Sequence, residues 1–248
     1  MEKNKRKYGW RPDLPDQRDI CFVPKFKEIP KKIDWSEFMP PVYDQGNLGS
    51  CTANGIAGAF DWERKQSGKE FIYPSRLFVY YNERAMEGTI GEDAGAFIRD
   101  GIKSVNKLGT CKEENWKYEV DKFACEPPKV CYEEALGYQV LEYKRVNSDI
   151  ISLKQALAEN PVVFGFTVYE SFETEEVSKT GVVPMPKENE SALGGHCVVA
   201  VGYDDETRKI KCRNSWGESW GDCGYFYLPY EYFTSDLTDD YWVIKLVE

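Results

Sequence analysis

The two halves of this 248-residue chain favour different kinds of secondary structure. The first half carries three segments rich in helix formers, two of which are followed by a glycine that can end a helix. They cover residues 51–66, 75–86 and 95–107. The second half holds β-branched or aromatic runs bounded by Gly, Pro, Asn or Asp. These runs cover residues 138–146, 162–169, 197–203, 209–214, 224–228 and 241–247, and one helix is expected at 150–159. Because helices and strands do not alternate, we predict an α+β protein.

Charge and hydropathy narrow the classes of partner. The chain has 42 acidic and 32 basic residues, and its formal charge of −10 repels phosphate backbones, so we expect no nucleic-acid partner. The longest uncharged apolar stretch, residues 162–169, is far shorter than the ~20 residues of a membrane-spanning helix. The first residues do not resemble a secretory signal, which predicts a cytoplasmic protein, and we expect a monomer.

The charge is divided unevenly along the chain. Residues 1–32 contain ten basic and five acidic side chains, whereas residues 33–248 carry a formal charge of −15. We interpret residues 1–28 as a basic N-terminal arm and residues 29–248 as the folded domain. Within that domain, approximately 45–137 should be mainly α and 138–240 mainly β. Two hypotheses follow: the arm lies on the acidic body and restricts the functional site, or it is a solvated tail.

The sequence contains a single histidine, His196. Any mechanism that needs an imidazole base at neutral pH must use it. The segment 217–221 matches the G-x-S-x-G pattern of serine hydrolases. In that pattern a strand precedes the serine, a helix follows it, and the histidine lies further along the chain. Here His196 comes first and a strand is expected after the serine, so we reject a serine hydrolase.

A cysteine nucleophile fits better. Cys51 stands at the start of a predicted helix, where the helix dipole and free N–H groups favour the reactive thiolate. Small residues around it allow a substrate backbone to approach closely. Gln45 supplies an amide donor that, beside the Cys51 N–H, can form an oxyanion hole. A buried structural cysteine is the alternative when this segment is considered alone.

Several motifs together resemble the papain family of cysteine peptidases over residues 29–248. The matched residues are Ile29-Pro30, Asp34-Trp35, Gln45-Gly46, Gly49-Ser50-Cys51, His196 before the apolar run 198–202, Asn214-Ser215-Trp216-Gly217 and Trp220-Gly221. His196 follows Cys51 by 145 residues, which is within the family's spacing of ~130–150 residues. The resemblance implies a helical lobe, an antiparallel β-barrel lobe and a substrate cleft between them.

The same resemblance implies the roles of individual residues. Cys51 is the expected nucleophile, His196 its proton-transfer partner, and Asn214 the residue that orients the imidazole. Gln45 and the Cys51 N–H are expected to hold the oxyanion. We also expect four residues to contact the peptide substrate or shield the site: Cys197, Trp216, Gly95 and Asp93.

The chain also departs from the family pattern. Leu48 replaces a cysteine that is usually in a disulfide, Thr52 replaces the tryptophan after the nucleophile, and the long helical pro-region is missing. Six cysteines other than Cys51 and Cys197 allow 15 complete pairings. Proximity in sequence suggests Cys125 with Cys131 and Cys212 with Cys223, although a reducing cytoplasm argues against any of them. The six cysteines that could pair are Cys21, Cys111, Cys125, Cys131, Cys212 and Cys223.

The predicted function is that of a cysteine endopeptidase that needs no cofactor. No C-x-x-C pair occurs and only one histidine is present, so we expect no zinc site. Two alternatives stay open. One is an exopeptidase or acyl-transferase that uses the same pair of residues, and the other is an inactive binding module of the same fold.

Overall fold

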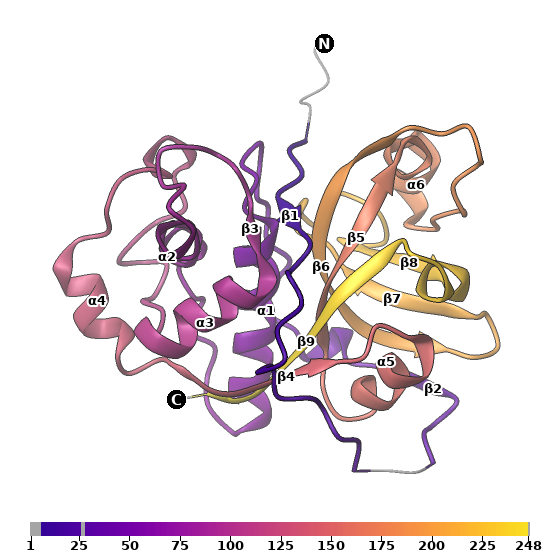
Figure 1. Ribbon diagram of the computed structural model, residues 1–248, viewed down its shortest axis with the longest axis horizontal. Helices are drawn as coiled ribbons and strands as arrows, with labels where there is room; N and C mark the ends of the chain where they lie inside the picture. Colours follow the sequence, from indigo (N-terminus) through magenta and orange to yellow (C-terminus); the bar gives the residue numbers. More distant parts are fainter. Residues whose placement is uncertain (1–5, 26–27, 248) are drawn as a thin grey trace.

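The computed structural model describes residues 6–25 and 28–247. Helices on one side of the molecule face a curved sheet on the other (Figure 1). The helical side contains α1 (Cys51–Gln66), α2 (Arg76–Glu87), α3 (Ile98–Leu108) and α4 (Lys129–Ala135). Short 3-10 helices occur at Ser36–Phe38, Val120–Lys122, Glu170–Glu173 and Tyr230–Thr234.

Helix α1 forms the junction between the two sides. Its residues from Cys51 to Arg64 are all buried, and it contacts α2 and α3 as well as the sheet. Gly55 allows this close packing, because a Cβ there would meet the Cys197 sulfur at 3.3 Å. A glycine inside a helix costs about 1 kcal/mol relative to alanine. The close contact with the sheet offsets that cost and brings the start of α1 against the strand that carries His196.

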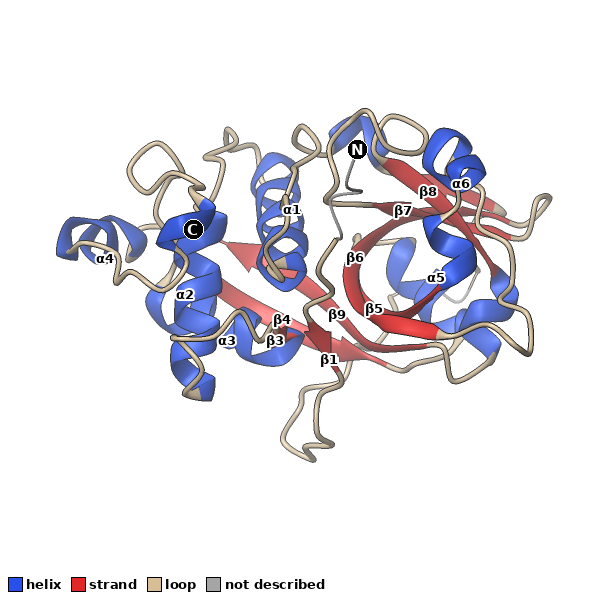
Figure 2. Ribbon diagram, turned by 90° about the horizontal axis from the view of Figure 1, so that it is seen from above, coloured by secondary structure: helices blue, strands red, loops and turns tan. Residues whose placement is uncertain are grey.

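The sheet has seven antiparallel strands among the described residues. Its order is β4-β9-β5-β6-β7-β8, and β2 pairs with β6 outside this path. The strands are β2 (Lys32–Asp34), β4 (Val140–Val146), β5 (Val162–Tyr169), β6 (Ala192–Asp204), β7 (Lys209–Arg213), β8 (Tyr225–Pro229) and β9 (Thr238–Val247). Figure 2 shows β5 and β6 curving around α5 (Ile150–Leu157), which packs on both.

The resemblance implied an antiparallel β-barrel on this side of the molecule. The antiparallel sheet is present and curved, and none of the pairings between described strands joins β4 to β8. The mixed α+β architecture was predicted correctly. Two short helices escaped the sequence analysis, α4 and α6 (Glu175–Thr180), because neither is long enough to show helical periodicity.

The described part of the N-terminal arm runs between the two sides of the molecule (Figure 1). Its strand β1 (Trp10–Arg11) pairs in parallel with β3 (Ala96–Phe97), which directly precedes α3. The helix predicted from residue 95 therefore starts at Ile98. Residues 1–5 and 26–27 of the arm lie outside the described residues. No helix in the ranges 6–25 and 28–247 is both long and apolar enough to cross a membrane.

Candidate active site

Cys51 is the first residue of α1 and is completely buried. The backbone N–H groups of Cys197, on β6, and of Gly9, in the arm, face its sulfur and favour the thiolate. Burial raises the pKa of the Cys51 thiol to about 11, although these N–H groups act in the opposite direction. The thiol is therefore protonated at neutral pH in this arrangement.

His196 lies on β6, directly before the residue whose N–H contacts the Cys51 sulfur. Its Nε2 is 2.8 Å from Oδ1 of Asn214, which fixes the orientation of the ring. Trp216 stacks on the imidazole with a centroid distance of 5.1 Å and an interplanar angle of 29°. All three side chains are buried. The histidine is thus held between an amide and an aromatic face, away from water.

No hydrogen bond joins the Cys51 and His196 side chains in the part of the chain that the structure describes. His196 Nδ1 is buried and has no hydrogen-bond partner there. The pKa of His196 is lowered to about 4, mainly by burial and also by the cationic Arg6, against the opposing effect of the Asn214 hydrogen bond. The Cys51 thiol and the His196 imidazole are therefore both neutral in this structure.

Gln45 is buried and its amide is fixed at both ends. Its Oε1 accepts a hydrogen bond of 2.6 Å from Oγ of Ser215, and its Nε2 donates to the Leu48 carbonyl at 2.8 Å. The same Nε2 donates at 3.4 Å to the carbonyl of Lys7, in the arm. The donor expected to meet a substrate oxyanion is therefore already directed at a peptide carbonyl.

Asp93 and Gly95 both contact the arm. Asp93 Oδ1 accepts hydrogen bonds from the Gly49 N–H (2.9 Å) and the Tyr80 hydroxyl (2.6 Å), while its Oδ2 pairs with Lys7 at 2.8 Å. A Cβ on Gly95 would lie 2.0 Å from the Gly9 carbonyl oxygen. The loop that carries these two residues thus contacts the arm and also supports the backbone just before the nucleophile.

Thr52 and Cys197 directly follow the expected nucleophile Cys51 and its partner His196 in the sequence. The Cys197 sulfur packs on Gly55 of α1. Thr52 donates a 2.6 Å hydrogen bond to Glu83, a fully buried carboxyl whose pKa burial raises to about 8. Glu83 was not singled out in the sequence, because residues 82–92 contain three other charged side chains and look like an ordinary helix surface and loop.

The arm crosses the cleft directly over the nucleophile. Gly9 lies so close to Gly49 that a Cβ on it would be 1.8 Å from the Gly49 carbonyl oxygen. On one side of this crossing, Tyr8 packs its ring edge against His196 and donates a hydrogen bond to Glu173. The Gly9 carbonyl accepts a 2.8 Å hydrogen bond from the Ala96 N–H.

Arg6 anchors the start of the described arm. Its guanidinium binds Asp44 at 2.9 Å and the Gly46 carbonyl at 3.1 Å, and it lies over the Trp216 ring at 5.4 Å. These contacts and those of Tyr8 occupy the side of the cleft formed by residues 44–46 and Trp216.

Trp10 fills a recess on the other side of the nucleophile. Its indole lies on two glycines, because a Cβ at Gly165 or Gly195 would approach the ring to 2.0 Å or 2.7 Å. Its Nε1 donates a 3.0 Å hydrogen bond to the fully buried carboxylate of Asp240. The recess therefore has a flat floor, formed by strands β5 and β6, and an acidic end.

A buried ionic cluster holds the arm beyond Trp10. Asp13 accepts hydrogen bonds from the Trp242 indole (3.0 Å) and the Arg99 N–H (3.3 Å), and its own N–H donates to Asp240 at 2.7 Å. Arg99, on α3, forms a bidentate pair with Asp19, and Arg145, on β4, lies 3.0 Å from Asp240. Both sides of the cleft therefore contribute an arginine to this cluster.

Burial and, to a lesser degree, the neighbouring Asp240 together raise the pKa of Asp13 to about 7. The sequence analysis missed Asp240, Tyr8 and Ser215. Ser215 stood inside a quoted motif, but only the fold reveals that its hydroxyl reaches Gln45.

All eight cysteines are free thiols in the structure. The pairing of Cys125 with Cys131 that proximity suggested is not formed in this structure, where Cys125 is exposed and Cys131 is buried. The same holds for Cys212, which is buried, and the exposed Cys223. Within the described ranges, no group of three or more His, Cys, Asp or Glu side chains is arranged to hold a metal ion.

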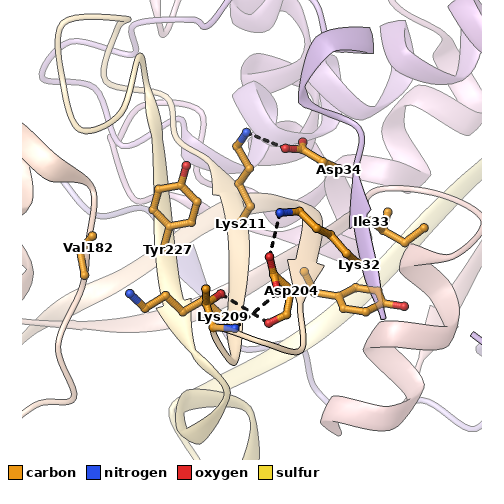
Figure 3. A pocket seen from close by; sticks show the side chains of 10 residues that line it. Lys32, Ile33, Asp34, Val182, Asp204, Lys209, Lys211 and Tyr227 are labelled. Atoms are coloured by element: carbon orange, nitrogen blue, oxygen red, sulfur yellow. Dashed lines mark hydrogen bonds and ion pairs between the residues drawn. The ribbon is translucent and has the colours of Figure 1, made fainter. Parts of the chain in front are cut away.

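A separate surface pocket of about 330 Å³ lies between β2 and the β6–β7 hairpin. Figure 3 shows Lys32 directed at Asp204 and Lys211 directed at Asp34, with N–O distances of 2.8 and 2.9 Å. None of the predicted site residues lines it. The pocket is therefore distinct from the cleft that the arm occupies.

The chain is similar to known cysteine proteases. Residues 29–244 match the model of the family described as papain family cysteine protease. The crystal structure of xylellain, a cysteine protease from Xylella fastidiosa, superposes with a TM-score of 0.92 at 43% identity and covers 100% of this chain and 99% of its own.

Two curated relatives are also similar. A peptidase C1-like protein of Acanthamoeba polyphaga mimivirus is 41% identical over 98% of this chain and 88% of its own length. The thiol protease aleurain of Arabidopsis thaliana is 31% identical over 80% of this chain and 55% of its own length. The similarity to aleurain thus spans about half of that protein.

Proposed function

Since this chain belongs to the papain family of cysteine proteases, we propose that it is an endopeptidase held latent by its own N-terminal arm. The observation that carries the proposal is the path of the arm. A continuous polypeptide passes over Cys51 with chain on both sides of it, Arg6 to Tyr8 on one side and Trp10 onward on the other. A cleft that accepts chain on both sides of the nucleophile suits cleavage inside a peptide.

The reaction begins when the arm leaves. Water and substrate then reach the cleft, so the burial that raises the thiol pKa and lowers the imidazole pKa is relieved. Cys51 transfers its proton to His196 and becomes a thiolate beside an imidazolium. Asn214 holds the ring through Nε2, which leaves Nδ1 free to face the sulfur.

The thiolate attacks the scissile carbonyl and forms a tetrahedral intermediate whose oxyanion needs donors. Gln45 Nε2, aligned by Ser215, and the Cys51 N–H at the start of α1 supply them. The imidazolium gives its proton to the leaving amine, and a thioester remains. Water, deprotonated by the same histidine, then hydrolyses the thioester and restores the thiol.

The arm suppresses this chemistry in two ways. It occupies the positions of a peptide, since the Lys7 carbonyl already binds Gln45 Nε2 and β1 pairs with β3. It also desolvates the reacting pair, so the neutral forms of Cys51 and His196 dominate. The hypothesis of a freely solvated tail does not account for these contacts of residues 6–19.

The test uses an internally quenched peptide with both termini blocked, and the cut sites are mapped by mass spectrometry. We expect little cleavage by the latent full chain and internal cleavage by Gly9→Ala, whose added Cβ displaces the arm. Adding Cys51→Ala should abolish that cleavage, and adding the matched control Cys125→Ala, at an exposed cysteine, should leave it unchanged. Cleavage restricted to peptides with a free terminus would identify an exopeptidase instead. Transfer of the acyl group to an added amine, with little hydrolysis, would identify an acyl-transferase.

An inactive binding module makes a different prediction. An epoxide inhibitor of thiol proteases should label Cys51 in the proposed enzyme, most rapidly when the arm is displaced. Absence of labelling in a variant whose arm is demonstrably displaced would overturn the proposal.

A further inference from the structure

Two buried thiols of the helical side, far from the cleft, lie next to each other. Cys111 follows α3 and Cys131 lies on α4, and both have no exposed surface. They belong to one small apolar cluster with Phe78 and Ala135, and their side chains are within hydrogen-bonding reach of each other. This contact joins segments that are 20 residues apart in the sequence.

The backbone around the two thiols is already held in place. The Cys111 carbonyl accepts a 2.8 Å hydrogen bond from the N–H of Ser75, which caps the start of α2. On the other segment, Glu134 of α4 accepts hydrogen bonds from the Lys112 N–H (3.2 Å) and the Asn115 side chain (2.8 Å). The thiols therefore meet at a preformed joint between α4 and the loop that follows α3.

Helix α4 is the element through which a reagent can reach this joint. It has seven residues and lies at the outer edge of the helical side (Figure 1). Val130, next to Cys131, is 64% exposed, and Leu136, directly after the helix, is 60% exposed. A short helix with so little apolar cover opens locally at a lower free energy than the whole domain.

We propose that Cys111 and Cys131 form a reversible disulfide when the protein meets a disulfide oxidant such as oxidised glutathione. The thiolate of Cys131 attacks a glutathione sulfur and releases one glutathione thiol, which leaves a mixed disulfide. The thiolate of Cys111 then attacks the Cys131 sulfur and releases the second glutathione. The two cysteines together lose two electrons and two protons, and oxidised glutathione gains them as it becomes two glutathione thiols.

The bond fastens α4 to the loop after α3 and, through Ser75, to the start of α2. It closes a loop of about 20 residues, and loops of this size stabilise folded proteins mainly by restricting the unfolded chain. For a domain of this length we expect the melting temperature to rise by about 5–10 °C on oxidation. Burial raises the pKa of both thiols, so the reaction should be slow at neutral pH and faster in mild alkali.

The experiment compares the full chain equilibrated in oxidised and in reduced glutathione. Free thiols are alkylated, the disulfides are mapped by mass spectrometry, and the melting temperature is measured. We expect a Cys111–Cys131 link, a higher melting temperature in the oxidised sample, and reversal of both by dithiothreitol. Because each sample is compared with its own reduced form, a variant that is less stable overall remains informative.

Three variants complete the test. Cys111→Ala and Cys131→Ala should lose the shift on oxidation, and the matched control Cys125→Ala, which removes the exposed cysteine of the same segment, should keep it. A link between Cys125 and Cys131, or alkylation of both Cys111 and Cys131 after Cys125 has been oxidised, overturns the proposal. None of these readouts depends on peptidase activity, so this inference and the proposed function fail independently.

Discussion

The backbone N–H of Gly9 lies against the sulfur of Cys51, and the Gly49 carbonyl leaves no room for a side chain at this crossing. Glycine is the only residue that passes here without displacing backbone atoms. The contact explains why the arm approaches the nucleophile closely enough to exclude water from it.

Gly9→Ala should displace the arm and activate the full chain. The added Cβ would be 1.8 Å from a backbone oxygen, and overpacking of this kind costs about 1–3 kcal/mol. We expect epoxide labelling of Cys51 to become roughly ten- to hundredfold faster. Gly91→Ala is the control, since a Cβ at Gly91 meets nothing within 4 Å. Equal labelling rates for Gly9→Ala and the parent chain would rule out the proposed crossing.

Displacement of the arm should also change the ionisation of Cys51. With the arm in place, the pKa of Cys51 is about 11 and that of His196 about 4, so the thiolate is scarce between these values. The thiolate absorbance of the full chain, corrected with Cys51→Ala, should therefore be small at pH 7 and larger in Gly9→Ala. A parent chain that already shows a full thiolate signal at pH 7 would contradict this account.

Docking of the arm should weaken as the pH rises towards 7. Asp13 has a pKa of about 7 when docked, above the ordinary value of 3.8 expected once the arm is free, so docking takes up a proton. Below about pH 4 the Asp13 carboxyl is protonated in both states, so it does not change the free energy of docking. As the pH rises to about 7, burying this carboxyl makes docking less favourable by at most about 4 kcal/mol, and the effect is constant at higher pH.

The reacting pair does not cancel this effect. Cys51 and His196 share one proton in the docked state and one in the open ion pair, so their opening neither takes up nor releases a proton. The groups that face Asp13 are Asp240, Asp19, Arg99 and Arg145.

The measurement is the ratio of epoxide labelling rates between the parent chain and Asp13→Asn. We expect this ratio to rise from pH 5 to pH 7 and to stay level above, while Asp16→Asn, which changes an arm carboxylate paired with Arg18, follows the parent. A ratio that is independent of pH would show that Asp13 does not control docking.

Gln45→Ala should lower kcat by about 10²–10³ with little change in KM, because it removes a donor that acts mainly on the oxyanion. Ser215→Ala should cause a smaller loss, since it removes the 2.6 Å hydrogen bond that aligns Gln45 but leaves the donor present. Steady-state kinetics of the activated enzyme separates the two parameters. A loss in Gln45→Ala below tenfold, or one confined to KM, would remove Gln45 from the oxyanion hole.

Local sequence patterns located the long elements accurately. Helix α1 and strand β5 have the predicted bounds, because a long apolar segment between clear start and stop signals leaves little freedom. Only one of the two hydrogen-bonded pairs at the site could be predicted. The resemblance implied the pair His196–Asn214. The pair Gln45–Ser215 depends on a hydroxyl that lies 170 residues away in the sequence, and no spacing rule identifies it.

Local sequence patterns could not predict the path of the arm. The charge difference suggested that a basic segment would lie on an acidic body, and two of its cations do bind Asp44 and Asp93. The strongest anchors, however, are the Trp10 indole on two glycines and the buried Asp13. Their partners Gly165, Gly195 and Asp240 come from three separate strand regions, and only the folded chain brings them together.

The arm is anchored by arginines from both walls of the cleft, yet it is joined to the domain through a single stretch between Cys21 and Pro30. While that stretch is intact, the blocking segment is present at a high effective concentration and rebinds after each release. One cut there would convert it into a separate peptide whose occupancy depends on dilution. Activation would then be irreversible in a dilute compartment and incomplete in a crowded one.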